Sequence, residues 1–334
     1  MNRLCGAIAL GDPGLVGDLF DAAALRRLHA CVDLAPGVVS AVDDPRSRRA
    51  LGAAEVLLTG WGAPVLDAGV LASARRLRVV VHTGGSVKRL APAAVWERGV
   101  RVSSSASVNA RPVAEYALAV VLLAGKRVLE SSRAYAQHRS LTAWSARAPF
   151  GNNGLVVGVV GASRTGRRLL ELLRPFDVEP LLHDPWVTPQ EARDLGAEAT
   201  GLHDLLARAD VVSLHAPALP ETHHLIGAPE LALMRDGTTI VNTARGSLID
   251  TRALVPEVLS GRLDAVLDVT DPEPLPPDHP LFDAPGVLLT PHVAGSLGNE
   301  LRRLGTCAVE EVERFVRTGE LAHEVHEADL HRTA

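Results

Sequence analysis

The chain has little of several residue types that would place it in a specialised class. It carries 3 cysteines in 334 residues, and Cys5, Cys31 and Cys307 are far apart. This odd number fits neither a disulfide framework nor a Cys-x-x-Cys metal site, so we expect inert thiols, a reducing cytoplasm and no bound metal. Aromatic residues make up only 3%, so Ala, Val and Leu must build the interior, and each of the 4 Trp residues stands out in it.

Basic charge and long apolar runs are also scarce. Lys and Arg number 34 against 39 Asp and Glu, a formal net charge of −5, which argues against a nucleic-acid partner. We see no run approaching the roughly 20 apolar residues of a membrane helix, and no export signal at the N-terminus, so we expect no membrane partner. Hydrophobic residues at 47% and charged residues at 22% are instead typical of a soluble globular protein, and the length suits two domains with a cleft between them.

Short apolar runs alternate with longer amphipathic segments in two series. AEVLLTG, RVVVHTG and VRVSSS belong to the first, within residues 54–105, and the second runs from LVVGVVG at 155 to GVLLTP at 291. This alternation indicates parallel β/α units and a doubly wound sheet of about six strands in the second series. The predicted fold class is α/β, with the second series inserted between two parts of another domain.

The segment between the two series has a helical pattern. It predicts one long helix from Ala106 to about His138, with Pro112 suited to a first turn. A looser stretch, SLTAWSARAPFGNNG, follows at 140–154. Another helix is predicted over roughly 299–318, which would return the chain to the first domain.

The stretch VVGASRTGRR, Val159 to Arg168, has the pattern of a phosphate-binding turn between a strand and a helix. Gly161 and Gly166 hold the first and third glycine places, but Ser163 replaces the middle glycine. Either a dinucleotide binds slightly further out, or the Ser163 hydroxyl itself donates to a phosphate oxygen. Asp184, at the end of the next strand, is placed to accept ribose hydroxyls, which favours NAD over NADP; the alternative is a turn residue before Pro185.

Three residues follow successive strands of the second series: Arg245 in VNTARGS, Glu273 in LDVTDPEP and His292 in LLTPHVAG. Ligands of open α/β sheets bind at the carboxyl ends of the strands. Hydride transfer to a keto acid needs a cation for the carboxylate, a proton donor, and an acid that keeps the donor charged, and these three residue types meet those needs. Taken singly, they could be a strand-end cap, a solvated loop acid and a turn residue, but all three at the strand ends of one sheet favour a site.

Four segments occur in a characteristic order: VVSLHAPALPETHHLIG, IVNTARGSLID, LDVTDPEPLPPDHPLF and LLTPHVAGS. With them the chain resembles the D-isomer-specific 2-hydroxyacid dehydrogenases, which include phosphoglycerate dehydrogenase and glyoxylate or hydroxypyruvate reductases. The resemblance runs from about Glu55 to Phe315. It implies two Rossmann-like domains, an NAD-binding domain at 106–297 and a substrate-binding (catalytic) domain at 1–105 and 298–334.

The resemblance also implies roles for single residues. Arg245 would bind the substrate carboxylate and carbonyl, His292 would be the acid/base and Glu273 its partner, with Asp268 at the nicotinamide carboxamide. The candidate cofactor-binding residues are Gly161, Ser163, Arg164, Thr165, Gly166, Asp184, His215, Ala216, Pro217, Thr243, Ala244, Asp268 and Gly295. The candidate substrate-binding residues are Trp61, Thr83, Gly84, Gly85, Ser86, Lys88, Asn109 and Arg245.

The substrate loop departs from the family pattern. Relatives read like R-A-G-x-G-x-D-N where this chain has HTGGSVKR, so Ser86 replaces a glycine and Lys88 replaces an acid. With Arg89, Lys88 could meet a second anionic group on the substrate, such as a phosphonate, phosphate or second carboxylate; the alternative, which we favour, is a solvated pair at a helix start. Trp61 could line the substrate pocket or fill core.

The sequence therefore predicts an NAD-dependent reductase of a small 2-keto acid, reversible toward the D-2-hydroxy acid, and a cytoplasmic homodimer joined through its nucleotide domain. One alternative is a catalytically silent NAD(H)-sensing or corepressor-like binding protein of the same fold. Another is a formate dehydrogenase, in which a glutamine typically precedes the histidine; here that residue is Pro291 and an acid, Glu273, is available.

Overall fold

The computed structural model describes residues 3–141 and 151–330. The chain divides into two compact units. Within the described residues, the terminal unit combines residues 3–110 with 296–330, and the central unit lies within Arg111–Gly295. Of the stretch expected to be loose, residues 142–150 lie outside the described residues.

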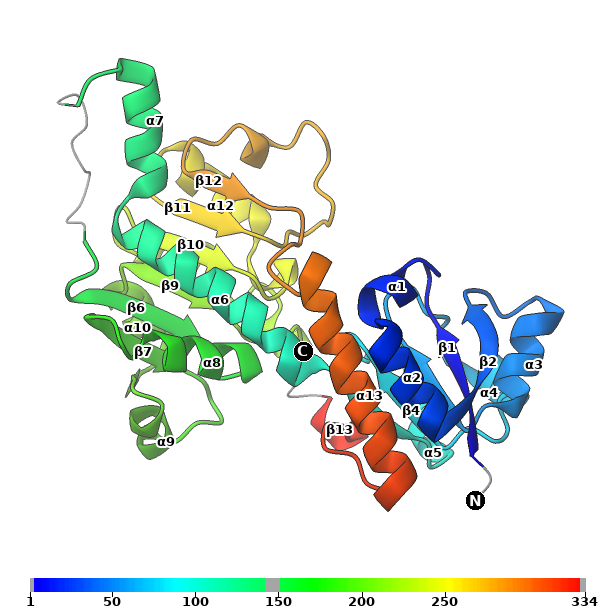
Figure 1. The fold of residues 1–334 in the computed structure, drawn as a ribbon. Coiled ribbons are helices and arrows are strands. Elements are labelled where there is room, and N and C mark those ends of the chain that lie inside the picture. Colours follow the sequence, from blue (N-terminus) through cyan, green and yellow to red (C-terminus); the bar gives the residue numbers. More distant parts are fainter. Residues whose placement is uncertain (1–2, 142–150, 331–334) are drawn as a thin grey trace. The chain divides into compact units, whose positions relative to one another are not determined.

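The terminal unit is a six-stranded sheet with helices on both faces (Figure 1). Its strands, in the spatial order β13-β5-β4-β3-β1-β2, are parallel except for β13. They are β1 (Leu4–Ala9), β2 (Val32–Val39), β3 (Val56–Thr59), β4 (Val79–His82), β5 (Arg101–Ser104) and β13 (Glu324–Val325). The helices are α1 (Leu15–Leu19), α2 (Ala22–Cys31), α3 (Pro45–Ala53), α4 (Ala68–Ser73), α5 (Ala93–Glu97) and α13 (Leu301–Thr318).

Burial on both faces explains the composition of these strands. All four residues of β3 and of β4 are buried, and such strands read as continuous Val and Leu runs with no polar face. One apolar cluster lies toward α3, α4 and α5 and the other toward α1, α2 and α13. The expected C-terminal helix is α13, which begins at Leu301 after a short 3-10 turn.

The central unit is a seven-stranded parallel sheet in the order β12-β11-β10-β9-β6-β7-β8. Its strands are β6 (Leu155–Val160), β7 (Val178–His183), β8 (Glu198–Ala199), β9 (Val211–Leu214), β10 (Thr239–Asn242), β11 (Asp264–Leu267) and β12 (Val287–Leu289). Its helices are α7 (Val128–His138), α8 (Arg164–Leu173), α9 (Pro189–Asp194), α10 (Leu202–Arg208), α11 (Ala228–Leu233) and α12 (Thr251–Leu259), with most of α6 (Ala106–Gly125). The six expected strands are present, and the short edge strand β8 is an addition.

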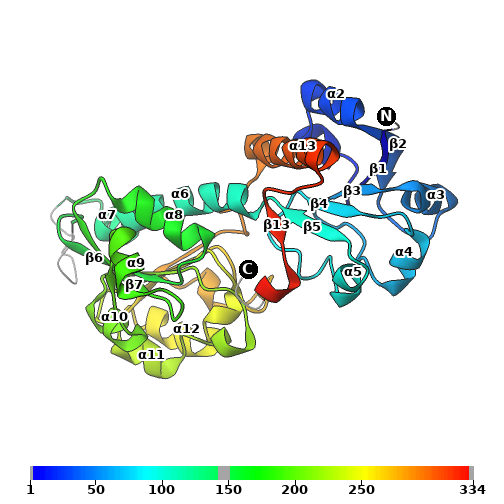
Figure 2. The same cartoon turned by 90° about the horizontal axis from the view of Figure 1, so that it is seen from below.

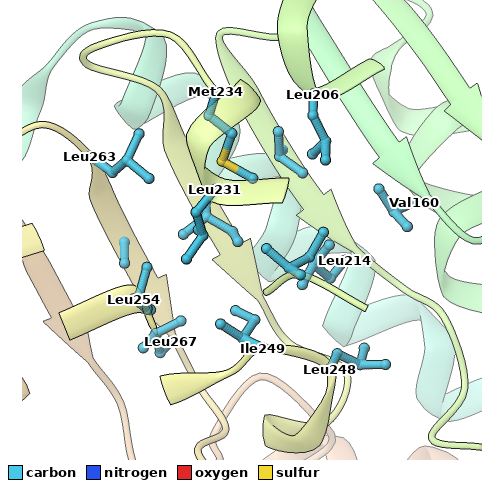
Figure 3. Close-up of a cluster of buried hydrophobic side chains, with 14 of the residues drawn as sticks. Val160, Leu206, Leu214, Leu231, Met234, Leu248, Ile249, Leu254, Leu263 and Leu267 are labelled. Atoms are coloured by element: carbon cyan, nitrogen blue, oxygen red, sulfur yellow. The ribbon is translucent and has the colours of Figure 1, made fainter. Parts of the chain in front are cut away.

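Two apolar layers enclose this sheet. Figures 1 and 2 show α6 and α8 on one face and α10, α11 and α12 on the other. The second layer contains Leu206, Leu231, Met234 and Leu254, all nearly inaccessible to solvent (Figure 3). Leu and Met side chains from three short helices thus interlock over the strands, which fixes the loops at the strand ends.

The prediction of one continuous helix over 106–138 is wrong. The chain leaves α6 at Gly125 and starts α7 at Val128, and between them Arg127 has a left-handed backbone with φ of 53°. The break lets the buried Arg127 side chain donate to the Gly237 carbonyl and lie 3.5 Å from an oxygen of Asp264. A buried guanidinium without partners is costly, and at this break Arg127 has both a carbonyl and a carboxylate partner.

Pro112 also differs from its expected place, because it lies inside α6 and not in its first turn. Within the described residues α6 is moreover long and apolar enough, by length and composition alone, to cross a membrane, contrary to the expectation that no run approaches that size. Its Ala114, Ala117 and Val121 are fully buried in the layer that also contains residues of β6 and α8. A core helix gives the same signal as a membrane helix, and 39% of the apolar window of α6 is buried in the structure.

Candidate active site

The glycine turn follows β6, which neighbours β9 where the strand order of the central sheet reverses. Ligands of doubly wound sheets bind at such a point. Gly161 has φ of 98°, and a Cβ there would lie 2.6 Å from the Ala216 nitrogen. A Cβ on Gly166 would lie 2.1 Å from the Gly161 carbonyl oxygen. Both positions therefore require glycine for close backbone packing of strand, turn and helix.

Ser163, in the place of the middle glycine, is the N-cap of α8. Its Oγ accepts a hydrogen bond from the Gly166 N–H at 3.3 Å, and Arg164 and Thr165 open the first helical turn. The cap uses a lone pair, so the hydroxyl proton is still available to an acceptor such as a phosphate. Sequence reasoning missed this cap, although serine before a helix is a common N-cap signal.

Asp184 braces the same turn. One carboxylate oxygen accepts the Ala162 N–H at 2.7 Å and the other accepts the Trp186 N–H at 2.8 Å. The sequence also offered the alternative that Asp184 is a turn residue before Pro185. Its hydrogen bond from the Trp186 N–H shows that it does stabilise this turn. Each oxygen keeps a further lone pair, so ribose hydroxyls remain acceptable partners.

A pocket of about 270 Å³ opens beside this carboxylate. It is lined by Leu182, Asp184, Val187, Pro189, Ala192, Ala199, Thr200 and Gly201. The lining comes from the end of β7, from α9, from β8 and from their adjoining loops. Of these residues the sequence pointed only to Asp184, because the rest of the pocket depends on how α9 packs on the sheet.

Two of the candidate cofactor residues after β9, His215 and Ala216, pack against the glycine turn. His215 is buried, and burial lowers its pKa to about 4, so its ring is neutral at neutral pH. Its Nε2 lies 2.8 Å from Ser213 Oγ. Ala216 is buried against Gly161, and Pro217 is partly exposed.

Arg245 lies in the loop after β10, and the buried Asn242 holds that loop in place. The Asn242 side chain donates to the Arg245 carbonyl at 2.8 Å and accepts from the Ala244 N–H at 3.0 Å. Arg245 itself donates to the Ala244 carbonyl at 2.6 Å. Asn242 had no predicted role, although an asparagine that bonds the backbone two residues later is a known turn signal.

The Arg245 guanidinium is partly buried in this loop. Burial lowers the pKa of Arg245, while the negative charge of the nearby Glu273 raises it. An arginine remains protonated at neutral pH despite such a shift. The geometry therefore provides a partly desolvated cation at the carboxyl end of the sheet, where a carboxylate ligand would be bound strongly.

The loops after β10 and β11 touch each other through backbone. A Cβ on Gly246 would lie 2.0 Å from the backbone of Thr270, so no larger residue fits next to Arg245 at this contact. Thr270 in turn donates from its hydroxyl to the Pro272 carbonyl at 2.8 Å. This close approach brings the segment that carries Glu273 beside the segment that carries Arg245.

Asp268 holds the segment that carries His292. Its carboxylate accepts the Thr290 hydroxyl at 2.6 Å and the N–H groups of Val293 and Ala294 at 2.7 and 2.9 Å, and its carbonyl accepts the His292 N–H at 2.9 Å. These contacts keep His292 at φ of 55°, a conformation that costs a non-glycine residue about 1 kcal/mol or more. The predicted role was a nicotinamide contact; the structure adds this positioning function.

His292 and Glu273 form a hydrogen-bonded pair. His292 Nδ1 and Glu273 Oε1 are 2.7 Å apart, and the two side chains are 51% and 43% exposed. A carboxylate accepts only from a protonated nitrogen, so Nδ1 carries hydrogen and Nε2 is the atom that can take up or release a proton. This is the arrangement of a general acid/base with a partner that fixes its tautomer.

The candidate substrate residues of the terminal unit gather at the ends of β3 and β4. The Thr83 N–H and hydroxyl both donate to the Thr59 carbonyl, at 2.8 and 3.0 Å. Gly84 packs so closely on the buried His82 that a Cβ would lie 2.5 Å from its Nε2. Burial lowers the His82 pKa to about 4, and Thr59 Oγ1 lies 3.0 Å from its Nδ1.

The remaining candidates of this unit lie on the adjoining loops, except for Asn109, which lies in the first turn of α6. The Asn109 amide lies 3.7 Å from where a Cβ on Gly85 would be, and its carbonyl oxygen accepts the Ser296 N–H. Ser86 Oγ lies 3.5 Å from the Lys88 N–H. Trp61 is 41% exposed and follows β3, so it fills no core.

One buried atom in the central unit bears on the cofactor. Thr243 Oγ1 is buried without a hydrogen-bond partner among the described residues. It lies directly after β10, beside Ala244 and Arg245, where the nicotinamide ring was expected. Orphaned buried hydroxyls are uncommon, so this oxygen fits a polar ligand group. Together with the glycine turn and the α8 N-terminus, the residues present fit a dinucleotide.

Comparison with known proteins identifies the family. The family model described as "D-isomer specific 2-hydroxyacid dehydrogenase, NAD binding domain" matches residues 118–294. D-3-phosphoglycerate dehydrogenase of Mycobacterium leprae is 36% identical over 294 residues, which covers 86% of this chain and 54% of that protein. Glyoxylate reductase of Aeropyrum pernix is 33% identical over 258 residues and is matched over 77% of its length, against 75% of this chain.

Solved structures show the same architecture. The TT0316 protein from Thermus thermophilus is 32% identical, with a TM-score of 0.76 over 97% of this chain and 100% of that one. D-mandelate dehydrogenase from Rhodotorula graminis, 23% identical, has a TM-score of 0.82 over 97% of this chain and 98% of that one, and shows the fold alone. The chain spans about half the length of the phosphoglycerate dehydrogenases that it matches. It belongs to the D-isomer specific 2-hydroxyacid dehydrogenases and contains their NAD binding domain.

Proposed function

We propose that the protein is an NAD-dependent dehydrogenase that reversibly reduces a small 2-keto acid to the D-2-hydroxy acid. The observation that carries this proposal is the 2.7 Å hydrogen bond between His292 and Glu273 at the sheet end that also holds Arg245. An acid/base pair and a partly buried cation are what reduction of a keto acid requires.

The proton chemistry follows from the ring orientation. Glu273 accepts from Nδ1, so protonated His292 presents an Nε2–H group to the substrate. In reduction that proton goes to the carbonyl oxygen, and the neutral ring that remains is the base for the reverse reaction. The hydrogen bond to Glu273 occupies Nδ1, so Nε2 is the ring nitrogen that faces the substrate.

Arg245 would bind the substrate carboxylate through paired N–H donors and polarise the carbonyl. Its main chain is already held by Asn242, so little ordering is needed when substrate binds. Bound NADH supplies the hydride for the carbonyl carbon. The residues that would hold the dinucleotide are those of the glycine turn, Asp184, the His215–Pro217 segment, Thr243 and Asp268.

The candidate substrate loop supports a carboxylate-binding role but no single substrate. The region from Thr83 to Ser86 offers backbone N–H groups, although the Thr83 N–H is already bonded to Thr59. The names of the relatives specify different substrates: phosphoglycerate, glyoxylate and mandelate. This chain also differs from the family pattern at Ser86 and Lys88. We therefore propose the reaction type and leave the keto acid to experiment.

The test is NADH consumption with a panel of 2-keto acids: pyruvate, glyoxylate, hydroxypyruvate, phosphonopyruvate, and branched and aromatic keto acids. Turnover with at least one of them, giving the D-product by chiral chromatography, is the expected result. Tight NADH binding without turnover of any member would favour the sensing or corepressor-like alternative.

We also propose a cytoplasmic homodimer, joined through the central unit. Leu123 of α6 and Tyr135 of α7 are 49% and 55% exposed, and exposed apolar side chains on neighbouring helices suit a subunit contact. Sedimentation equilibrium of the wild type and of Leu123→Glu tests this. A monomeric wild type would contradict the proposal.

A further inference from the structure

Two histidines and an aspartate converge on the surface of the central unit. One ligand atom from each of His223, His224 and Asp271 lies within 4.8 Å of the other two, and all three side chains are accessible to solvent. The histidines follow a 3-10 turn after β9, and the aspartate follows β11. Dehydrogenation as proposed above uses none of these three residues.

The backbone holds these side chains in place. The His224 N–H donates to the Ser247 carbonyl at 2.8 Å, and His224 has a left-handed φ of 52°. The two imidazole rings lie side by side, with centroids 3.9 Å apart. On the other loop, the Asp271 carbonyl accepts the Thr251 hydroxyl at 2.9 Å. Both loops are thus fixed independently of any ligand.

The donor set is that of a divalent metal ion. Two neutral imidazoles and one carboxylate are ligands that Zn²⁺ prefers, with a water completing four-coordination. Ligand atoms around tetrahedral Zn²⁺ lie about 3.4 Å apart, so exposed side chains within 4.8 Å of each other need only small rotations. A second carboxylate oxygen, that of Asp250, lies 4.0 Å from His224 Nδ1 and adds negative charge.

We propose that His223, His224 and Asp271 form a surface site for a divalent transition-metal ion such as Zn²⁺. The bound ion would join the loop after β9 to the loop after β11. Asp271 is two residues before Glu273, so the ion would restrain the segment that positions the partner of His292. The site would therefore link metal availability to the rigidity of this loop, without a metal taking part in the proposed reaction.

The experiment measures Zn²⁺ binding to tag-free full-length protein by competition with a chromophoric chelator. The wild type should bind one equivalent. His223→Ala, Asp271→Asn and His224→Asn should each weaken the affinity at least about tenfold. Asparagine is chosen at His224 because it tolerates a left-handed backbone. His203→Ala is the matched control, because His203 is exposed and 3.6 Å from one carboxylate, that of Glu230.

Hydrogen exchange provides a second readout that does not depend on activity. Zn²⁺ should slow amide exchange over 268–275 in the wild type and in His203→Ala but not in Asp271→Asn. Urea unfolding in the absence of metal shows that each variant is folded. The proposal is overturned if the wild type binds no Zn²⁺, or if the three ligand variants bind it as well as the control does.

Discussion

The two units share an architecture and differ in what their strand ends present. Each buries a neutral histidine at a carboxyl strand end: His82, the last residue of β4, and His215, the first residue after β9, both have a pKa lowered to about 4 by burial. Each ring has one hydroxyl neighbour, Thr59 or Ser213. A buried imidazole at this position is thus a structural device common to both sheets and is no sign of acid/base chemistry.

Within the described residues, the central unit adds to this pattern an exposed histidine that is hydrogen-bonded to an acid. His292 bonds Glu273 and is about half exposed, whereas His82 is enclosed and bonds a hydroxyl. The difference teaches that exposure, a hydrogen-bonded acid and a place at the strand ends together distinguish a candidate catalytic histidine from a packed one. The comparison predicts that chemistry depends on loops of the central unit and that the terminal unit modulates substrate choice.

The largest expected effect is that of His292→Ala. Loss of the acid/base should lower kcat by about 10²-fold or more, about 2.7 kcal/mol, with NADH affinity unchanged. His203→Ala, an exposed histidine of the same unit, should leave kcat within about twofold. Steady-state kinetics and NADH fluorescence titration measure both. Unchanged turnover in His292→Ala would remove the role assigned to this residue.

Glycine replacement compares the close packing of the two units. Gly166→Ala should destabilise the central unit by about 3 kcal/mol, because its Cβ would meet a backbone oxygen at 2.1 Å. Gly84→Ala should cost the terminal unit about 1 kcal/mol, because the atom it meets belongs to the His82 side chain. Urea titration followed by hydrogen-exchange mass spectrometry reports each unit separately. Equal losses of unfolding free energy in the two variants would show that both turns adjust equally well to an added methyl group.

The buried histidines predict a shared loss of stability in acid. Their folded-state pKa of about 4 lies below the ordinary value of about 6.5, so between these values the unfolded chain binds more protons. Stability is therefore full above about pH 6.5 and falls as the pH drops toward 4. Each histidine should remove about 2 kcal/mol between pH 7 and pH 5.

Two variants assign this acid sensitivity to the units. His82→Asn should flatten the pH dependence of the terminal unit, and His215→Gln that of the central unit, in urea unfolding at pH 7 and pH 5. Asparagine and glutamine retain a polar atom for Thr59 and Ser213 respectively. If a variant keeps the wild-type pH dependence, its histidine is not the group that titrates.

A smaller effect is expected from Asp184→Ala, which removes the carboxylate beside the glycine turn. NADH binding should weaken about tenfold and discrimination against NADPH should relax, because a 2′-phosphate is no longer repelled and the Ala162 N–H loses its acceptor. Fluorescence titration with both cofactors measures this. A wild-type preference for NADPH would contradict the ribose assignment.

Local patterns were most informative where one segment decides its own conformation. The apolar runs of β3, β4 and β6 and the glycines at 161 and 166 were readable because burial on both faces and tight turns restrict residue type directly. The break at Arg127 was not readable, since it depends on a carbonyl and a carboxylate far along the chain. The cap formed by Ser163 was readable from the sequence, but the serine was considered only as a replacement for glycine.

By itself the sequence determined the fold class, the two strand series and the residue types of the candidate site, because hydrophobic periodicity and turn chemistry are local properties. The tertiary structure alone decided which loops touch. Packing of Gly246 on Thr270 brings the Arg245 segment beside the Glu273 segment. Asp268 accepts hydrogen bonds from the segment that carries His292. The turn after β9 places His223 and His224 near Asp271. These contacts join residues tens of positions apart, and their distances arise from sheet order and packing, which no single segment encodes.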